Sequence, residues 1–275
     1  MKKQILVIEP GRLSRRSWMD LWDYRELFFV LAWRDVTVRY KQTVIGLLWA
    51  ILRPFLAMVV FTIIFGKLAG LPSEGVAPYA LLVFAALLPW NLFSTALSEA
   101  GNSLVGNSQL ISKVYFPRLI VPAAAVVTAL IDFVLSLLIL FGLMVWYQYV
   151  PDWHIVLLPA LIVMATLAAL GPGLYLAAMT AKYRDFRHLI PFVLQFGLYV
   201  SPVGFSSSIV PEDWRLLYSL NPLVGIIDGV RWSILRGETA FDWRSMAISA
   251  VVIALTLWIG IRQFRRTEGA LVDVI

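Results

Sequence analysis

Few residues in this chain of 275 could carry out catalysis, and their spacing gives them no common site. Cysteine is absent, which excludes disulfides, thiolate metal sites and cysteine nucleophiles. The two histidines, His154 and His188, lie beside different apolar runs. No GxxxxGK[ST] loop occurs, so the chain does not itself bind ATP through a P-loop. Without paired carboxylates, metal ligands or a nucleophile beside a base, we expect neither an enzyme nor a metal site.

Asp132 is the one acidic residue deep within a long apolar run. An ionisable group at that depth in a membrane is by default a candidate functional residue. Two interpretations stay open from the sequence. Asp132 either relays protons or forms hydrogen bonds inside a helix bundle.

The composition indicates a membrane protein. Hydrophobic residues make up 60% of the chain and charged residues 15%, with a mean hydropathy of +0.80. Soluble domains are about 45–50% apolar and about 25% charged. The net charge of +6 comes largely from Lys and Arg beside the apolar runs, which favours contact with anionic lipid rather than nucleic acid.

Six apolar runs are long enough to cross about 30 Å of hydrocarbon. They cover residues 48–69, 78–97, 119–147, 154–180, 187–205 and 245–263. With both termini inside, 17 of the 23 Lys and Arg residues fall on the inner side and five on the outer side, while Arg53 lies in the first run. This asymmetry supports the orientation. It also places His154 and His188 on opposite faces. The apolar stretch 5–8 is too short for a signal peptide.

The N-terminal region predicts a helix over residues 18–35 followed by a basic segment that enters the first span. One helical face carries Leu21, Tyr24, Phe28, Leu31 and Ala32, and an aromatic stripe carries Trp22, Phe29 and Trp33. Such a helix either lies in the headgroup plane or packs on its own protein in the cytoplasm. The basic segment, residues 34–54, is either an anchor that fixes orientation or an element that a cytoplasmic partner grips.

The inner loop between the second and third spans, residues 99–117, predicts a short helix over 109–114. Asn107 or Ser108 is the expected cap, and Pro117 ends the segment. We expect an exposed apolar face beside Lys113 and Arg118, made of Leu110, Ile111, Val114, Tyr115 and Phe116. Apolar side chains on an inner loop favour burial in a partner, and re-entry of the loop into the bilayer is the alternative.

The outer segment between the fifth and sixth spans, residues 205–244, predicts two short helices that begin at Pro211 and Pro222. Both are too apolar for water and too short to span, which favours a re-entrant hairpin over an ordinary outer cover. Asp228 and Arg231 are three residues apart and are expected to pair.

Five segments together resemble one family, the membrane subunit of type 2 ABC exporters for lipid-linked polysaccharide, namely the O-antigen, capsule and teichoic-acid permeases. They are RDVTVRYKQTVIGLLWAILRP, LISKVYFPRLIVP, RDFRHLIPFVLQFGLYVSPV, NPLVGIIDGVR and FRRTEGALVDVI. They follow the family order and cover nearly the whole chain from about residue 20. The resemblance implies an all-α integral membrane protein in the inner membrane, with cytoplasmic termini, a cytoplasmic region over 1–46, a six-span domain over 47–264 and a tail over 265–275.

The resemblance also implies a half-transporter. Two copies form the pore, and two copies of a separate P-loop ATPase, which holds ATP and Mg, bind below it; this chain carries no cofactor. The family's interface helix corresponds here to Trp22, Arg25, Phe29, Trp33 and Arg34. Its coupling helix corresponds to Leu110, Ile111, Lys113, Val114, Tyr115 and Phe116, and its gate to Asn221, Pro222, Asp228 and Arg231.

A channel for long sugar chains needs sliding contacts, which aromatic faces supply. The candidates are Trp90, Phe93, Tyr199, Phe205, Tyr218 and Trp232. Each is equally consistent with an aromatic belt at the lipid interface.

Two alternatives for the function remain. A proton-coupled secondary transporter needs an ion site near the midplane, with Asp132 as its seed. A type 2 ABC permease for lipid or drug shares the architecture, but the short outer loop over 70–77 argues for the polysaccharide branch.

Overall fold

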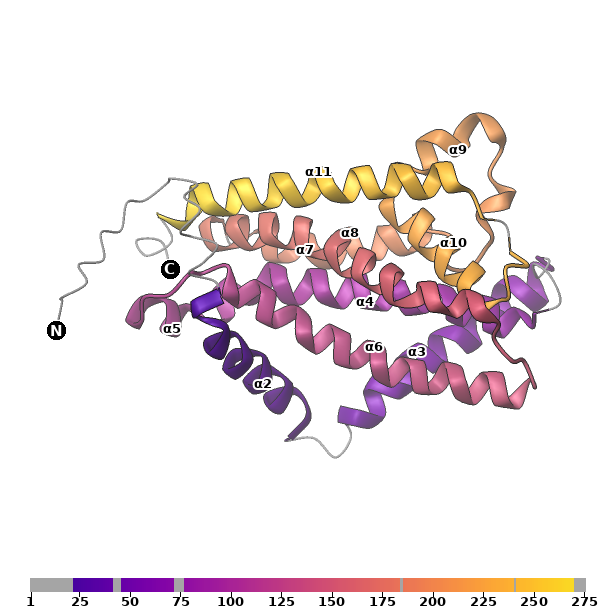
Figure 1. The fold of residues 1–275 in the computed structure, drawn as a ribbon, viewed down its shortest axis with the longest axis horizontal. Coiled ribbons are helices and arrows are strands. Elements are labelled where there is room, and N and C mark those ends of the chain that lie inside the picture. Colours follow the sequence, from indigo (N-terminus) through magenta and orange to yellow (C-terminus); the bar gives the residue numbers. More distant parts are fainter. Residues whose placement is uncertain (1–21, 42–45, 72–76, 184, 240, 270–275) are drawn as a thin grey trace.

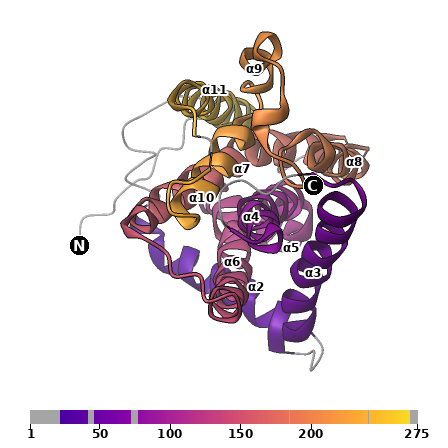
Figure 2. The same ribbon diagram turned by 90° about the vertical axis from the view of Figure 1, so that its right-hand side faces the viewer.

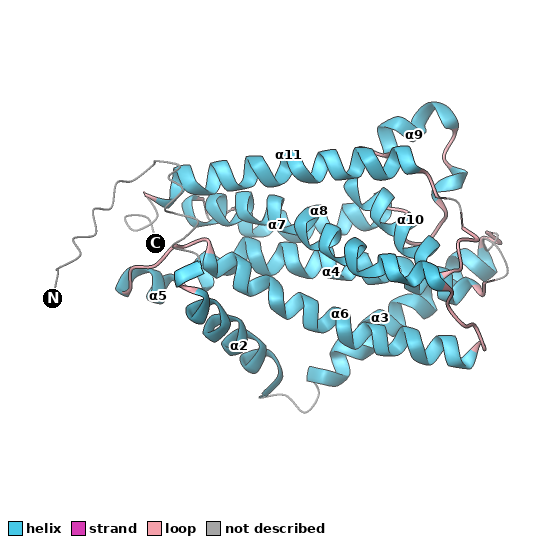
Figure 3. Cartoon of the chain, viewed as in Figure 1, coloured by secondary structure: helices cyan, strands magenta, loops and turns pink. Residues whose placement is uncertain are grey.

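The computed structural model describes residues 22–41, 46–71, 77–183, 185–239 and 241–269. Figures 1 and 3 show helices joined by short loops, with no strand in these ranges. The expected all-α class is therefore confirmed. Residues 1–21, which include the first residues of the expected N-terminal helix, and residues 270–275 of the expected tail lie outside the described residues.

Long helices form the body of the molecule: α2 (Arg25–Lys41), α3 (Gly46–Phe61), α4 (Tyr79–Gly106), α6 (Ile120–Trp146), α7 (Leu158–Lys182), α8 (Phe186–Val200) and α11 (Trp243–Glu268). The π-helix η1 (Thr62–Leu68) continues α3. Shorter elements connect them: α5 (Ser108–Lys113), η2 (Trp153–Leu157), η3 (Ser207–Ile209), α9 (Glu212–Tyr218) and α10 (Pro222–Ile234).

Helix α4 is the centre of the bundle. In the end-on view of Figure 2, α3, α6, α7, α8 and α10 surround it. Its first turns, from Leu81 to Leu88, are almost fully buried. Because nearly every face of α4 meets another helix, the side chains of α4 make up much of the interior of the bundle.

Five helical segments are long and apolar enough to cross a membrane: Leu48–Leu68, Tyr79–Gly106, Ile120–Trp146, Trp153–Lys182 and Trp243–Glu268. They correspond to five of the six expected spans. The sixth, expected over 187–205, is the shorter apolar helix α8. It ends at Val200 because Ser201 is extended (φ −87°, ψ 150°) before Pro202, and the residue before a proline is disfavoured in the helical region. The expected extent of this helix to residue 205 is therefore wrong.

The two ends of the bundle differ (Figure 1). Helix α5, the first turns of α6 and the last turns of α7 and α11 lie at one end, and α9 and α10 lie at the other. The first end carries Lys113, Arg118, Lys182, Arg187, Arg265 and Arg266. The histidines are at opposite ends, since His154 is in η2 and His188 is in the first turn of α8. This arrangement agrees with the expected alternation of the spans.

Close backbone packing holds α7 against α11. A Cβ atom added at Gly260 would lie 2.1 Å from the carbonyl oxygen of Gly171, and one added at Gly171 would lie 2.7 Å from the amide nitrogen of Leu257. Small residues at such crossings let membrane helices gain contact area without a hydrophobic driving force between them. Glycine is therefore required at both positions.

Candidate functional site

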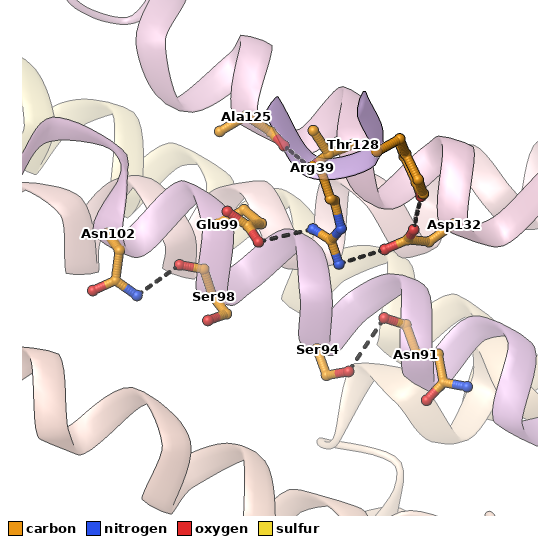
Figure 4. Close-up of polar contacts among 10 residues, drawn as sticks. Arg39, Asn91, Ser94, Ser98, Glu99, Asn102, Ala125, Thr128 and Asp132 are labelled. Carbon is orange, nitrogen blue, oxygen red and sulfur yellow. Dashed lines mark hydrogen bonds and ion pairs between the residues drawn. The ribbon is translucent and has the colours of Figure 1, made fainter. Parts of the chain in front are cut away.

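One face of α4 carries a polar stripe within an otherwise apolar span. The residues recur every three or four positions, which places them on one side of the helix: Asn91, Ser94, Thr95, Ser98, Glu99 and Asn102. Figure 4 shows most of them along this side. Two bond to the helix's own backbone, Ser94 to the carbonyl of Asn91 at 3.2 Å and Asn102 to that of Ser98 at 2.9 Å. The polar atoms of the stripe thus lie together along a single edge of α4.

Arg39, in the last turn of α2, joins three helices. Its Nη1 donates to Oε1 of Glu99 on α4 at 2.9 Å, and its Nη2 lies 2.7 Å from Oδ2 of Asp132 on α6. Figure 4 shows the guanidinium between the two carboxylates. The side chains are 20–45% exposed, so this is a partly solvated network. It fixes the end of α2 against the central helices.

Asp132 forms a second contact within the same network. The hydroxyl of Tyr40 donates to Oδ1 of Asp132. Burial and this hydrogen bond both raise the pKa of Tyr40, so the phenol stays protonated and acts as a donor. Of the two interpretations of Asp132, the structure supports hydrogen bonding inside the bundle, because both of its carboxylate oxygens have partners.

An open groove of about 400 Å³ runs along this stripe. Its lining comes from α2, α4 and α8: Arg39, Trp90, Ser94, Thr95, Ser98, Glu99, Leu194 and Gln195. We call it the polar groove. Sequence reasoning missed it, although the signal was present as a polar residue every three or four positions from 91 to 102. Gln195 lies outside that pattern, and its place in the groove could not be predicted because it depends on the packing of α8 beside α4.

Polar side chains at membrane depth need water, protein or a ligand, because hydrocarbon satisfies none of their hydrogen bonds. Within the described residues, the side chains of Thr95, Ser98 and Gln195 make no hydrogen bond. Thr95 and Ser98 are partly exposed and Gln195 is exposed. The polar groove therefore offers side chains that water or a polar ligand could satisfy.

The short inner helix was expected over 109–114 and is observed as α5 over 108–113. Asn107 stands at its cap position, but its side chain accepts from Arg34 of α2 at 2.5 Å instead of capping α5. Val114 and Tyr115 are 52% and 60% exposed. The expectation that Ile111 and Phe116 share this exposed face is wrong.

Both residues are buried, at 4% and 3% exposure, and they join an inner core with Leu31 and Ala32 of α2. Leu110 is partly buried against the same core, and Lys113 is exposed. The segment thus offers a smaller outward surface than the sequence suggested, made of Lys113, Val114 and Tyr115.

Helix α2 has the two faces that the sequence predicted. Leu31 and Ala32 are buried, and Tyr24 and Phe28 pack against the same core. The aromatic stripe points outward, with Trp22, Phe29 and Trp33 at 66–74% exposure. Arg25 lies 5.8 Å from the ring of Trp22. The helix continues past residue 35 to Lys41, with Arg39 and Lys41 in the last turn, where positive charge favours the helix dipole.

A fixed junction at the opposite end is built around Arg231, which is 1% exposed. Its guanidinium donates to the carbonyls of Leu82, Val203 and Phe205 at 2.9–3.1 Å. Tyr79 donates to the carbonyl between the latter two, that of Gly204, at 2.5 Å. Buried donors thus hold three consecutive carbonyls after α8.

The other predicted gate residues lie around this junction. Asn221 caps α10 by accepting from the amide of Leu223 at 3.1 Å, and Pro222 follows at the first helical position, as expected. Asn221 also donates to Ser201 at 3.0 Å. Asp228 is 7% exposed, and its pairing with Arg231 stays a prediction. Burial and the charge of Asp228 raise the pKa of Tyr218, which keeps that phenol neutral.

The six predicted channel aromatics do not line one surface of the single chain. Trp90 and Phe93 are neighbours, with ring centroids 6.0 Å apart, and of the six only Trp90 lines the polar groove. Trp232 packs on His154 and Phe241 at the end of the bundle that carries α10. Tyr199 is 67% exposed on α8, whereas Phe205 and Tyr218 are partly buried. Their role in a channel stays a prediction.

The sequence of this chain is similar to those of known transporter proteins. The family described as "ABC-2 type transporter" matches residues 26–235. The "O-antigen export system permease protein RfbA" of Myxococcus xanthus is 30% identical over 255 residues, which is 91% of this chain and 96% of that protein. A protein of the same name from Klebsiella pneumoniae is 22% identical over 91% of this chain and 95% of its own length.

Proposed function

This chain belongs to the ABC-2 type transporter family, and from that premise we propose that it is the permease subunit of an O-antigen export system. In this proposal it moves lipid-linked polysaccharide from the cytoplasmic to the outer face of the inner membrane. The names of relatives that match over nine-tenths of the chain support the substrate class.

The observation that carries the proposal is the polar groove within an apolar bundle. A hydroxyl-rich polymer can cross hydrocarbon only where polar groups replace its water. The stripe from Asn91 to Asn102 covers about three helical turns of α4, a rise of about 17 Å. That is roughly half of the hydrocarbon thickness of about 30 Å.

We propose that α8 is the sixth crossing. Its 15 residues rise about 22 Å, which is short of the hydrocarbon thickness. The chain then continues through residues 201–206, which are mostly buried. Non-helical backbone is tolerated at membrane depth when protein satisfies it, and Arg231 and Tyr79 do so here. Six crossings place both termini on the same side, which the excess of Lys and Arg makes the cytoplasmic one.

The working assembly in this proposal has two copies of the chain and two copies of a separate ATPase, which binds ATP and Mg. Lys113, Val114 and Tyr115 form the docking surface for the ATPase, and α2 lies along the inner leaflet with Trp22, Phe29 and Trp33 toward lipid. ATP binding closes the ATPase pair and shifts α5. The buried core shared by α5 and α2 carries that shift to the two permease halves, which separate alternately.

Deletion of the gene and complementation test this function. We expect the deletion strain to retain lipid-linked polysaccharide in the cytoplasmic leaflet, with export restored by the wild-type gene. Restoration also needs the partner ATPase with an intact P-loop lysine. Undiminished surface polysaccharide in the deletion strain would overturn the proposal.

A further inference from the structure

The charges around the polar groove disfavour an anionic ligand. Arg39 is the cation of the lining, and it is already shared between Glu99 and Asp132. These three groups together carry one excess negative charge. A phosphate placed in the groove would meet a carboxylate before it met an available cation, and like charges in a partly desolvated site repel strongly.

The hydrogen-bonding groups of the groove instead suit a neutral, hydroxyl-rich ring. Arg39 occupies Oε1 of Glu99, while Oε2 has no hydrogen bond within the described residues. A carboxylate oxygen is a strong acceptor for hydroxyl donors. Thr95 and Ser98 can donate and accept, and Gln195 adds an amide with both functions.

The size and walls of the groove fit the same kind of ligand. A volume of about 400 Å³ lies at the lower end of the range for small-ligand sites, about 300–1,000 Å³. Leu194 and the 5%-exposed Trp90 form apolar walls. Because so little of Trp90 is exposed, it offers a sugar no stacking platform.

We propose that the polar groove is a binding site for uncharged sugar units of the polymer, with Glu99 as the residue that selects hydroxyl donors over phosphate. This inference rests on the proposed export function. It assigns the groove to the glycan and places the charged link between lipid and sugar elsewhere. Arg39 acts as a positioning residue that holds Glu99 through its ion pair.

The absence of cysteine makes a direct test possible. Ser98→Cys is made in the full chain and reconstituted in lipid nanodiscs, and its modification by a charged, water-soluble thiosulfonate is timed. With maltohexaose as a neutral probe at roughly ten times a Kd of about 1 mM, we expect modification to slow about tenfold. Inorganic pyrophosphate at the same concentration should leave the rate unchanged. Ser112→Cys, on exposed α5, is the accessible control and should be insensitive to both.

Second-site variants separate direct contact from general structure. Glu99→Gln added to Ser98→Cys should abolish protection by maltohexaose, whereas Asp132→Asn, which breaks the other ion pair of Arg39 outside the groove lining, should preserve it. Protection by pyrophosphate, no protection by sugar, or an unreactive thiol at position 98 would each overturn the inference. If the wild type still exports polymer in complementation, such a result leaves the export function standing; if it does not, the export function itself fails.

Discussion

Arg39 lies 2.7 Å from Asp132 across the junction of α2 and α6, and the same guanidinium bonds to Glu99 of α4 at 2.9 Å. The side chain of Arg39 therefore connects α2 both to α4, which carries the polar stripe, and to α6. Arg39 and Glu99 are 60 residues apart in the sequence, and Tyr40 and Asp132 are 92 residues apart. These contacts therefore fix tertiary structure and not local turns.

The first prediction concerns this ion pair. Arg39→Ala leaves two carboxylates without their cation and should lower the free energy of unfolding by about 1–2 kcal/mol, a value reduced for partial exposure. In a double-mutant cycle with Asp132→Asn, the two effects should be non-additive. Thermal unfolding in detergent measures both, with the exposed Arg244→Ala as control. Additive effects would show that the pair is not energetically coupled.

A second prediction follows for transport. Asp132 is held by Arg39 and Tyr40, so we expect it to serve structure and to have no part in ion coupling. Asp132→Asn should therefore retain export at a level that follows protein abundance, which complementation and immunoblotting measure together. Loss of export from a normally abundant variant, with ATPase coupling intact, would instead favour a proton-coupled transporter.

The third prediction concerns the outer junction. Arg231→Met removes the guanidinium donor from the carbonyls of Leu82, Val203 and Phe205 and should lower the free energy of unfolding by about 3 kcal/mol or more. Arg231→Lys keeps the charge but lacks the planar fork, so it should rescue only part of the loss. Arg215→Lys, on exposed α9, is the matched control. Wild-type stability of Arg231→Met would contradict the role assigned to this residue.

The fourth prediction separates the roles of two neighbouring residues after α5, Tyr115 and Phe116. Tyr115→Ala, at an exposed position, should leave the fold intact and reduce stimulation of ATP hydrolysis by the partner. Phe116→Ala, at a buried position, should lower the free energy of unfolding by about 3 kcal/mol. Co-purification with the ATPase and thermal unfolding distinguish the two. Equal destabilisation by both variants would show that the exposed and buried assignments are wrong.

The fifth prediction tests the contact between α7 and α11. Gly171→Ala places a Cβ 2.7 Å from the backbone of α11 and should lower the free energy of unfolding by about 1–3 kcal/mol through overpacking. Gly142→Ala, which meets nothing within 4 Å, should be neutral. Thermal unfolding of the two variants measures the difference. Equal stability would contradict the close backbone packing of α7 against α11.

Local patterns predicted much of this fold. Apolar length located five helices that are long and apolar enough to cross a membrane. Proline with a capping residue located the start of α10, and the start of α9 to within one residue. The end of α8 was predicted too far along the chain because apolar length alone does not register Pro202, and Ser201 leaves the helical region before that proline.

The functional site was harder to predict because its contacts are distant in sequence. Nothing near Asp132 in the chain indicates Arg39, and nothing near Phe116 indicates the α2 residues that bury it. The exposed face predicted for the inner loop was partly wrong, because the packing of α2 decides which of its apolar residues are covered. Charge counting needs no such contacts, and the orientation that it gives stays a prediction.

Reconstituted transport tests the central claim most directly. The purified chain and its ATPase are placed in proteoliposomes loaded with lipid-linked polysaccharide on the ATPase side, and polymer reaching the opposite leaflet is quantified with a membrane-impermeant lectin. We predict transfer that requires this chain, the ATPase and hydrolysable ATP together. Transfer without ATP, or none with all three components present, would contradict the assignment of this chain as the permease of an O-antigen exporter.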